Sequence, residues 1–290
     1  AAKIPVVRRG EALGSLSELY KIQGKLDRAL EVLKEAHEID PDDAKHLFNI
    51  GSIYLEQKKL DEASDLFQQV IDRAPDFSLA LLNLGYIAKV QGRPEEAEEI
   101  YRRAIEIDPD GVEARANLAH LHLDQEHFEE AREVFREVRA RKSGLVDIDL
   151  GLLATLARDG AWPEVVELLG EVLSAFPEVA VELDKPADAA RTLVRLGAAL
   201  VRQNLTKCAE FAFMAAVFLD EGFLDARRGL AELHFVQAAY WKAVAQYEAM
   251  LLGNPQDAAA FERLGDCYRH LGVEDAARMC YEQSRRIAGL

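Results

Sequence analysis

The sequence predicts an all-α protein, an α-solenoid built from about eight stacked helix-turn-helix repeats. The prediction rests on a 34-residue pattern that recurs along nearly the whole chain and on helically spaced apolar residues within each copy. In residues 44–77, Leu47, Ile50 and Tyr54 share one face of a first helix, and Phe67 lies on the apolar face of a second. Two short helices bury such stripes only in part, so each pair needs neighbours.

The repeats keep a constant phase. Pro41, Pro75, Pro109 and Pro177 lie at multiples of 34 residues from one another. With this proline at position 32, the repeats begin at residues 10, 44, 78, 112, 146, 190, 224 and 258. Positions 8 and 20 are small in all repeats except the fifth, which predicts close approach of the two helices, because larger side chains there would overpack by about 1–3 kcal/mol. Position 24 is bulky, as Leu33, Phe67, Tyr101, Phe135, Phe213, Tyr247 and Tyr281.

These residues resemble the tetratricopeptide repeat family, in which Leu, Gly, Tyr, Ala, Phe and Pro recur at fixed offsets. The resemblance covers residues 10–290. It implies a right-handed superhelix whose first helices line a concave groove, and a protein or peptide partner bound in that groove. We therefore expect a non-catalytic adaptor or scaffold rather than an enzyme. Two alternatives stay open: a substrate-positioning domain of a larger enzyme, and a self-associating assembly scaffold.

The chain divides into four parts by this phase: a lead-in at 1–9, repeats one to five at 10–179, an insertion at 180–189 and repeats six to eight at 190–290. We expect the lead-in to be loose or a partial cap. Pro186 suits the first turn of a helix and Asp184 the cap before it, so the insertion should lengthen the first helix of repeat six backwards. It is either a hinge or binding ridge, or a tolerated surface insertion.

Repeat five departs from the pattern. Leu153 and Val165 occupy its positions 8 and 20, where the other repeats have small residues. We expect its two helices to lie farther apart or to cross differently, so regular stacking should break at repeats five and six.

Composition narrows the classes of partner. The net charge of −16 argues against nucleic acid as a general partner, because phosphate binding uses clustered Lys and Arg. The absence of a run of about 18 apolar residues predicts no membrane insertion. The first residues lack the apolar core of a secretory signal, and we predict a cytoplasmic location. Cys208, Cys267 and Cys280 form no even set, so we expect reduced core residues.

Position 6 of the first helices supplies the main candidate site. It is asparagine in three successive repeats, as Asn49, Asn83 and Asn117. An amide is both donor and acceptor, so a row of amides can hold the backbone of an extended peptide. The row resembles the asparagine ladder in the repeat domain of O-GlcNAc transferase, which implies a ligand-holding role. The alternative is that each amide bonds the neighbouring helix and keeps the repeats in register.

Other inner residues complete the expected site. Around the amides, Phe48, Leu82 and Tyr86 form apolar walls, with Lys45 and Lys89 among them; exposed apolar surface of this extent marks a binding site. His120 is also counted with the partner-binding residues. Repeat six offers a basic set formed by Arg191, Arg195 and Arg202, with Arg158 one repeat earlier. This set should favour carboxylates unless it pairs with acidic residues of adjacent repeats.

Catalytic and cofactor motifs are not expected. His120 and His122 are two residues apart on a helix and point to different faces, so together with His127 they make a poor metal site. The sequence has no phosphate loop, nucleophile elbow or paired-carboxylate motif. We therefore expect no cofactor, and a protein that acts by binding.

Overall fold

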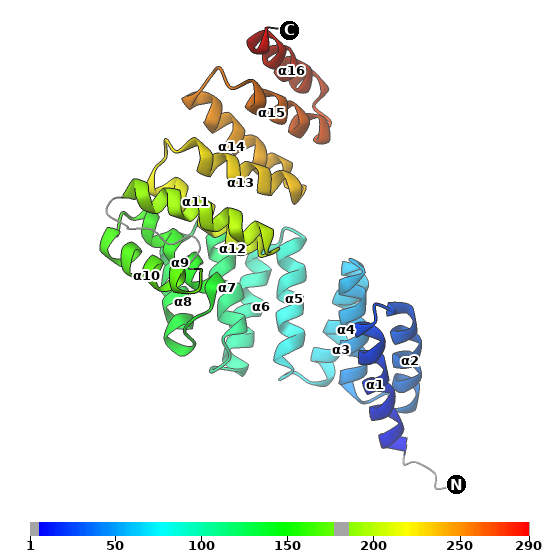
Figure 1. The fold of residues 1–290 in the computed structure, drawn as a ribbon. Coiled ribbons are helices and arrows are strands. Elements are labelled where there is room, and N and C mark those ends of the chain that lie inside the picture. Colours follow the sequence, from blue (N-terminus) through cyan, green and yellow to red (C-terminus); the bar gives the residue numbers. More distant parts are fainter. Residues whose placement is uncertain (1–5, 177–185, 290) are drawn as a thin grey trace. The chain divides into compact units, whose positions relative to one another are not determined.

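The computed structural model describes residues 6–176 and 186–289, which form sixteen helices joined by short turns, with no strand among them (Figure 1). The predicted all-α fold is confirmed. The helices are α1 Val6–Ile22, α2 Leu26–Ile39, α3 Ala44–Glu56, α4 Leu60–Arg73, α5 Ser78–Val90, α6 Pro94–Ile107, α7 Glu113–Asp124, α8 Phe128–Arg141, α9 Val146–Arg158, α10 Trp162–Ser174, α11 Pro186–Arg202, α12 Thr206–Leu219, α13 Leu224–Val236, α14 Tyr240–Gly253, α15 Ala258–His270 and α16 Glu274–Ala288.

Each repeat is a first helix, a three-residue turn and a second helix. The turns share one left-handed residue at position 15, which lets the chain reverse within three residues. These residues are Gly24, Lys58, Gly92, Glu126, Gly160, Asn204, Ala238 and Gly272.

Two helix boundaries bear on the sequence predictions. α1 begins at Val6, so part of the predicted lead-in is helical, and α11 begins at Pro186, as predicted for repeat six. Asp184, the predicted cap, lies outside the described residues.

Glycine at position 8 makes room for the bulky residue at position 24 of the same repeat. A Cβ added at Gly85 would lie 2.5 Å from Cε1 of Tyr101, and one added at Gly51 would lie 2.9 Å from Cε1 of Phe67. Both rings are buried. The sequence predicted that the helix backbones would nearly touch; instead, an aromatic ring lies over the glycine and fills the space between the helices.

The same ring also packs against the next repeat. In repeat five a Cβ added at Gly151 would lie 2.5 Å from Cζ of Phe135, and in repeat seven one added at Gly229 would lie 2.5 Å from Cε1 of Phe213. Both glycines occupy position 6, the position of the three asparagines. In these two repeats position 6 therefore borders the ring of the preceding repeat.

Regular stacking breaks at repeats five and six, as predicted. In repeats one to three and six to eight the first helix packs most extensively on the second helix of its own repeat, but α9 packs more extensively on α12 than on α10. α9 is accordingly buried on all sides from Ile148 to Ala157. The far end of α12 also reaches α8, where the rings of Phe128 and Phe218 meet edge to face with centroids 5.5 Å apart.

The chain forms two compact units, divided between Gln125 and Glu126 in the turn after α7. The N-terminal unit contains α1 to α7, and the C-terminal unit contains α8 to α16. The hinge considered at 180–189 falls largely on residues 177–185, outside the described part of the chain.

Candidate partner-binding face

The inner face is defined here as the side of the first helices that carries positions 2, 5, 6, 9, 12 and 13. In the N-terminal unit it includes Asn49 on α3, Asn83 on α5 and Asn117 on α7, all half-buried. Among the described residues, no hydrogen bond joins any of these three amides to another protein group. The expectation that they bond neighbouring helices therefore finds no support in this part of the chain.

An apolar stripe, here called the α5 stripe, lies beside the amides. It consists of Leu79, Leu82, Tyr86 and Val90, which follow one another at helical spacing. Leu79, Tyr86 and Val90 are 52%, 49% and 51% exposed, whereas Leu82 is half-buried against the core. Three large apolar side chains, each about half exposed on one helix, form a surface that a partner could cover.

The remaining expected residues of the N-terminal unit differ in accessibility. Lys45 is exposed. Phe48 belongs partly to the core, because its ring centroid lies 5.6 Å from that of Phe67 and 5.0 Å from that of Phe77. Lys89 forms an ion pair with Asp124. His120 is only 3% exposed, so its side chain is not part of the accessible inner face in this structure.

The basic set of the C-terminal unit is only partly brought together. Arg191, Arg195 and Arg202 are exposed on α11, and Arg191 lies 3.2 Å from Asp188 of its own helix. Arg158 is placed differently: its guanidinium lies 4.2 Å from the centroid of the Phe128 ring, where it stacks. The predicted pairing of these arginines with acids of adjacent repeats is not observed for Arg191, whose partner is within its own helix.

Repeats seven and eight carry a polar network on the inner face that the sequence analysis missed. Glu232 accepts hydrogen bonds from the Tyr247 hydroxyl at 2.7 Å and from Arg263 Nε at 3.0 Å. In the next repeat the Tyr281 hydroxyl donates to Asp266 at 2.9 Å. Burial raises the pKa of Glu232, but the hydrogen bonds from Arg263 and Tyr247 outweigh it and lower the pKa overall. The sequence could have predicted this network, because both repeats have a carboxylate at position 9 and a tyrosine at position 24.

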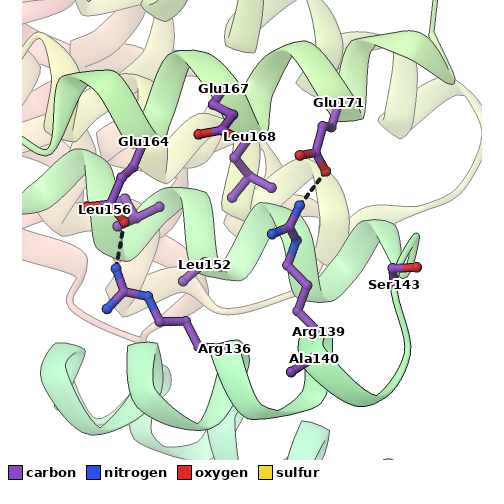
Figure 2. Close-up of a pocket in the computed structure, with 10 residues that line it drawn as sticks. All are labelled: Arg136, Arg139, Ala140, Ser143, Leu152, Leu156, Glu164, Glu167, Leu168 and Glu171. Atoms are coloured by element: carbon purple, nitrogen blue, oxygen red, sulfur yellow. Dashed lines mark hydrogen bonds and ion pairs between the residues drawn. The ribbon is translucent and has the colours of Figure 1, made fainter.

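A cleft of about 370 Å³ lies between α8 and α10, with α9 as its floor (Figure 2). Leu152, Leu156 and Leu168 supply its apolar lining. Two ion pairs cross it, one between Arg136 and Glu164 at 2.6 Å and one between Arg139 and Glu171. Arg139 also donates to the buried Asp149 at 3.0 Å.

This cleft offers little to a ligand. Burial raises the pKa of Asp149, although Arg139 opposes the shift. The arginines that line the cleft are engaged by carboxylates of the protein itself, in contrast to the amides of the N-terminal unit. We therefore take the inner face of α3, α5 and α7 as the candidate site.

Comparison with known proteins identifies the repeats of the first half of the chain. Three models, each described as a tetratricopeptide repeat, match residues 8–76, 48–112 and 91–147. Residues 8–147 are thus matched by tetratricopeptide repeat models. A search of curated proteins found no match. Tetratricopeptide repeat proteins bind protein or peptide partners, so the matched repeats support a protein-interaction scaffold.

Solved structures of other tetratricopeptide repeat proteins share the fold. A tetratricopeptide repeat protein from Parabacteroides merdae ATCC 43184 is 17% identical with a TM-score of 0.52, over 97% of this chain and 93% of that one. MamA (41-end) from Desulfovibrio magneticus RS-1 is 16% identical with a TM-score of 0.51, over 59% of this chain and 96% of that one. At these identities the likeness concerns the fold alone.

Other kinds of site were sought in the described residues. Within residues 6–176 and 186–289 there is no group of three His, Cys, Asp or Glu side chains that could hold a metal ion. In the same residues, no helix has both the length and the apolar character needed to cross a membrane. Cys208, Cys267 and Cys280 are buried and free, so the prediction that they are core residues is confirmed.

Proposed function

We propose that this protein is a non-catalytic adaptor that binds an extended segment of a partner protein on the inner face of α3, α5 and α7. In this proposal Asn49, Asn83 and Asn117 hold the partner's backbone, and apolar side chains of the partner cover the α5 stripe. The cytoplasmic location predicted from the sequence is retained as part of the proposal.

One observation carries the proposal: three equivalent amides, half-buried and without hydrogen bonds to described parts of the protein, lie beside a half-exposed apolar stripe. Covering that stripe removes apolar surface from water, at about 25 cal/mol for each Å² buried. The half-buried amides then pair with partner groups in a partly dry setting, where a hydrogen bond is stronger than in water.

The amides favour an extended partner over a helix. An extended segment has free backbone N–H and C=O groups that an amide can satisfy in both directions, whereas a helix has already paired its own backbone groups. A helix would use the α5 stripe and leave the amides unpaired. The two kinds of partner therefore differ in how strongly binding depends on the asparagines.

The test compares two triple variants against a partner segment obtained by pulldown. The first replaces Asn49, Asn83 and Asn117 with Ala. The control replaces Asp65, Glu99 and Arg103, which are exposed on the second helices α4 and α6, with Ala. Each lost hydrogen bond costs about 0.5–1.5 kcal/mol, so the asparagine triple should weaken Kd by roughly tenfold to a thousandfold in calorimetry.

The control triple should bind like the parent, and circular dichroism should show that both variants stay folded. If the folded asparagine triple binds as tightly as the parent, the amides do not hold the partner. An added change of Tyr86→Ala then separates the remaining cases. If binding is lost with that change, the partner is a helix on the α5 stripe. If binding is unchanged, the partner binds elsewhere than on the inner face of the N-terminal unit.

A further inference from the structure

The turns between the two helices of each repeat change character halfway along the chain. Position 16, the last residue of the turn, is basic in the first four repeats, as Lys25, Lys59, Arg93 and His127. It is apolar in the last four, as Ala161, Leu205, Ala239 and Val273. Turn tips at a protein surface are normally polar, so a row of apolar turns within the C-terminal unit requires an explanation.

Large apolar side chains are exposed around three of these turns, in repeat eight as Leu271 and Val273 and most strongly in repeat seven. We call Val201, Leu205, Val236 and Trp241 the turn edge of repeats six and seven; their exposed fractions are 43%, 43%, 79% and 65%. The turns of repeats six, seven and eight follow one another along the right-hand side of the C-terminal unit in Figure 1. Side chains as exposed as Val236 stand out from the surface and do not line a groove.

The charge around the turn edge is the reverse of that of the whole chain. The second helices α12 and α14 have no acidic residue in their first turns, whereas α4, α6 and α8 each have two. Basic residues flank the apolar ones instead, as Arg202, Lys207 and Lys242. The turn edge is therefore locally basic in a protein whose net charge is −16. Repeat eight ends this region, because α16 begins with Glu274 and Asp275.

The helix termini add to the basic character of the turn edge. α12 and α14 both begin there, and neither has a side-chain cap. Helix N-termini carry a partial positive charge and exposed N–H donors, which favour anions. Basic side chains, uncapped helix N-termini and protruding apolar residues thus coincide within two neighbouring turns.

We propose that the turn edge of repeats six and seven binds the surface of a membrane rich in anionic phospholipid. Phosphate groups lie against Lys242, Arg202 and the N-termini of α12 and α14, and Val236 and Trp241 enter the boundary between headgroups and acyl chains. Tryptophan suits this depth because its ring is apolar and its N–H is polar. Contact is peripheral, and it uses none of the residues proposed to hold the partner segment.

Charge and shape favour this occupant over the others. A second copy of the chain paired edge to edge would place the same basic residues against one another. A peptide partner needs a groove to be held on two sides, and the protruding side chains of the turn edge do not provide one. A bilayer is anionic, extended and able to receive protruding apolar side chains.

Vesicle co-sedimentation tests the proposal with the whole chain. The parent should bind vesicles of phosphatidylcholine mixed with phosphatidylserine, should not bind pure phosphatidylcholine, and should be released as salt rises. The double variant Val236→Glu with Trp241→Glu should bind these vesicles at least about tenfold more weakly than the parent. The matched control is Leu252→Glu, a change at the other end of α14, where Leu252 is 86% exposed; it should bind like the parent.

Tryptophan fluorescence gives a second readout. In a Trp162→Phe background Trp241 is the remaining tryptophan of the two in the chain, and its emission should shift to the blue when phosphatidylserine vesicles are added. The proposal is overturned if the parent does not bind these vesicles. That result would favour an acidic protein as the partner of the turn edge. It is also overturned if the folded double variant binds as well as the parent, or if Leu252→Glu loses binding to the same extent.

Discussion

Replacing Gly85 with alanine should destabilise the N-terminal unit, although alanine is the better helix former. A Cβ at Gly85 would lie 2.5 Å from Cε1 and 2.8 Å from Cδ1 of Tyr101. Ordinary carbon contacts are about 3.5–4.0 Å, so the ring would have to retreat by about 1 Å. Tyr101 is 1% exposed and has little room to do so. Overpacking costs about 1–3 kcal/mol and better helix propensity returns about 0.5–1 kcal/mol, which leaves a net loss of up to about 2.5 kcal/mol.

The assay is urea unfolding of the full chain followed by circular dichroism, with Gly14→Ala as the matched control. Gly14 also lies inside a helix of the N-terminal unit, but nothing lies within 4 Å of an added Cβ there. The control should therefore gain about 0.5–1 kcal/mol. If Gly85→Ala stabilises the protein as much as Gly14→Ala does, the ring over the glycine does not set the helix spacing and the packing argument fails.

A compensating change sharpens this test. Position 24 is leucine in the two repeats in which position 8 is larger than alanine: Ser17 is paired with Leu33, and Leu153 with Leu169, whereas Ala119 and Ala231 are paired with the rings of Phe135 and Tyr247. Adding Tyr101→Leu to Gly85→Ala should therefore recover part of the loss. A double-mutant cycle should give a favourable coupling of about 0.5–3 kcal/mol, whereas strictly additive effects would contradict a direct contact between the two positions.

Three further predictions concern the C-terminal unit. Ala238 has φ of 59°, and Ala238→Gly should raise the free energy of unfolding by about 0.5–1 kcal/mol because an L-residue in this conformation costs about 1–2 kcal/mol; an unchanged urea midpoint would contradict this. Burial lowers the pKa of His234 from 6.5 to about 4. On acidification the unfolded chain therefore binds this proton at a higher pH than the folded chain does. The free energy of unfolding should fall by up to roughly 3 kcal/mol as the pH is lowered from 6.5 to about 4. His234→Phe should remove that part of the pH dependence. Burial raises the pKa of Cys208 and Cys267 to about 11, so at pH 8 both thiols should react with a thiol reagent only after the protein is unfolded.

The helix positions were predictable because each repeat carries its own local signals. The small residues at position 8, the alanine at position 20 and the proline at position 32 fix the phase, and α3, α5, α9, α13 and α15 begin at the predicted repeat starts. α7 begins one residue later, at Glu113.

The packing of α9 on α12 was only half predictable. Leu153 and Val165 signalled that repeat five is irregular, but they do not say which helix replaces α10 as the main neighbour of α9. A second signal was present in α12, whose sequence is apolar on every side, with Phe211 and Phe213 both buried. A helix of this kind needs neighbours all round. The division after Gln125 had no such signal, because the turn there has the same length and left-handed residue as the others.

The sequence proposes residues for the candidate site but does not give their burial. The 34-residue phase placed Asn49, Asn83 and Asn117 at equivalent positions, which is a property of the sequence. Their half-burial depends on three-dimensional packing that helical spacing does not give; at Gly151, for example, the ring of Phe135 borders position 6. The burial of His120 has the same kind of cause: exposure at position 9 varies with the local neighbours, so Tyr86 is 49% exposed and His120 3%.

Site-specific photocrosslinking shows directly whether a partner segment lies on the inner face of the N-terminal unit. A benzophenone amino acid replaces Tyr86 on the α5 stripe in one variant and Arg103 on the outer side of α6 in the other, and each is irradiated with the partner segment. If the partner lies there, we expect a crosslink from position 86 and little from position 103. The position 86 crosslink should be lost when Asn49, Asn83 and Asn117 are all alanine. A strong crosslink from position 103 with none from position 86 would contradict it.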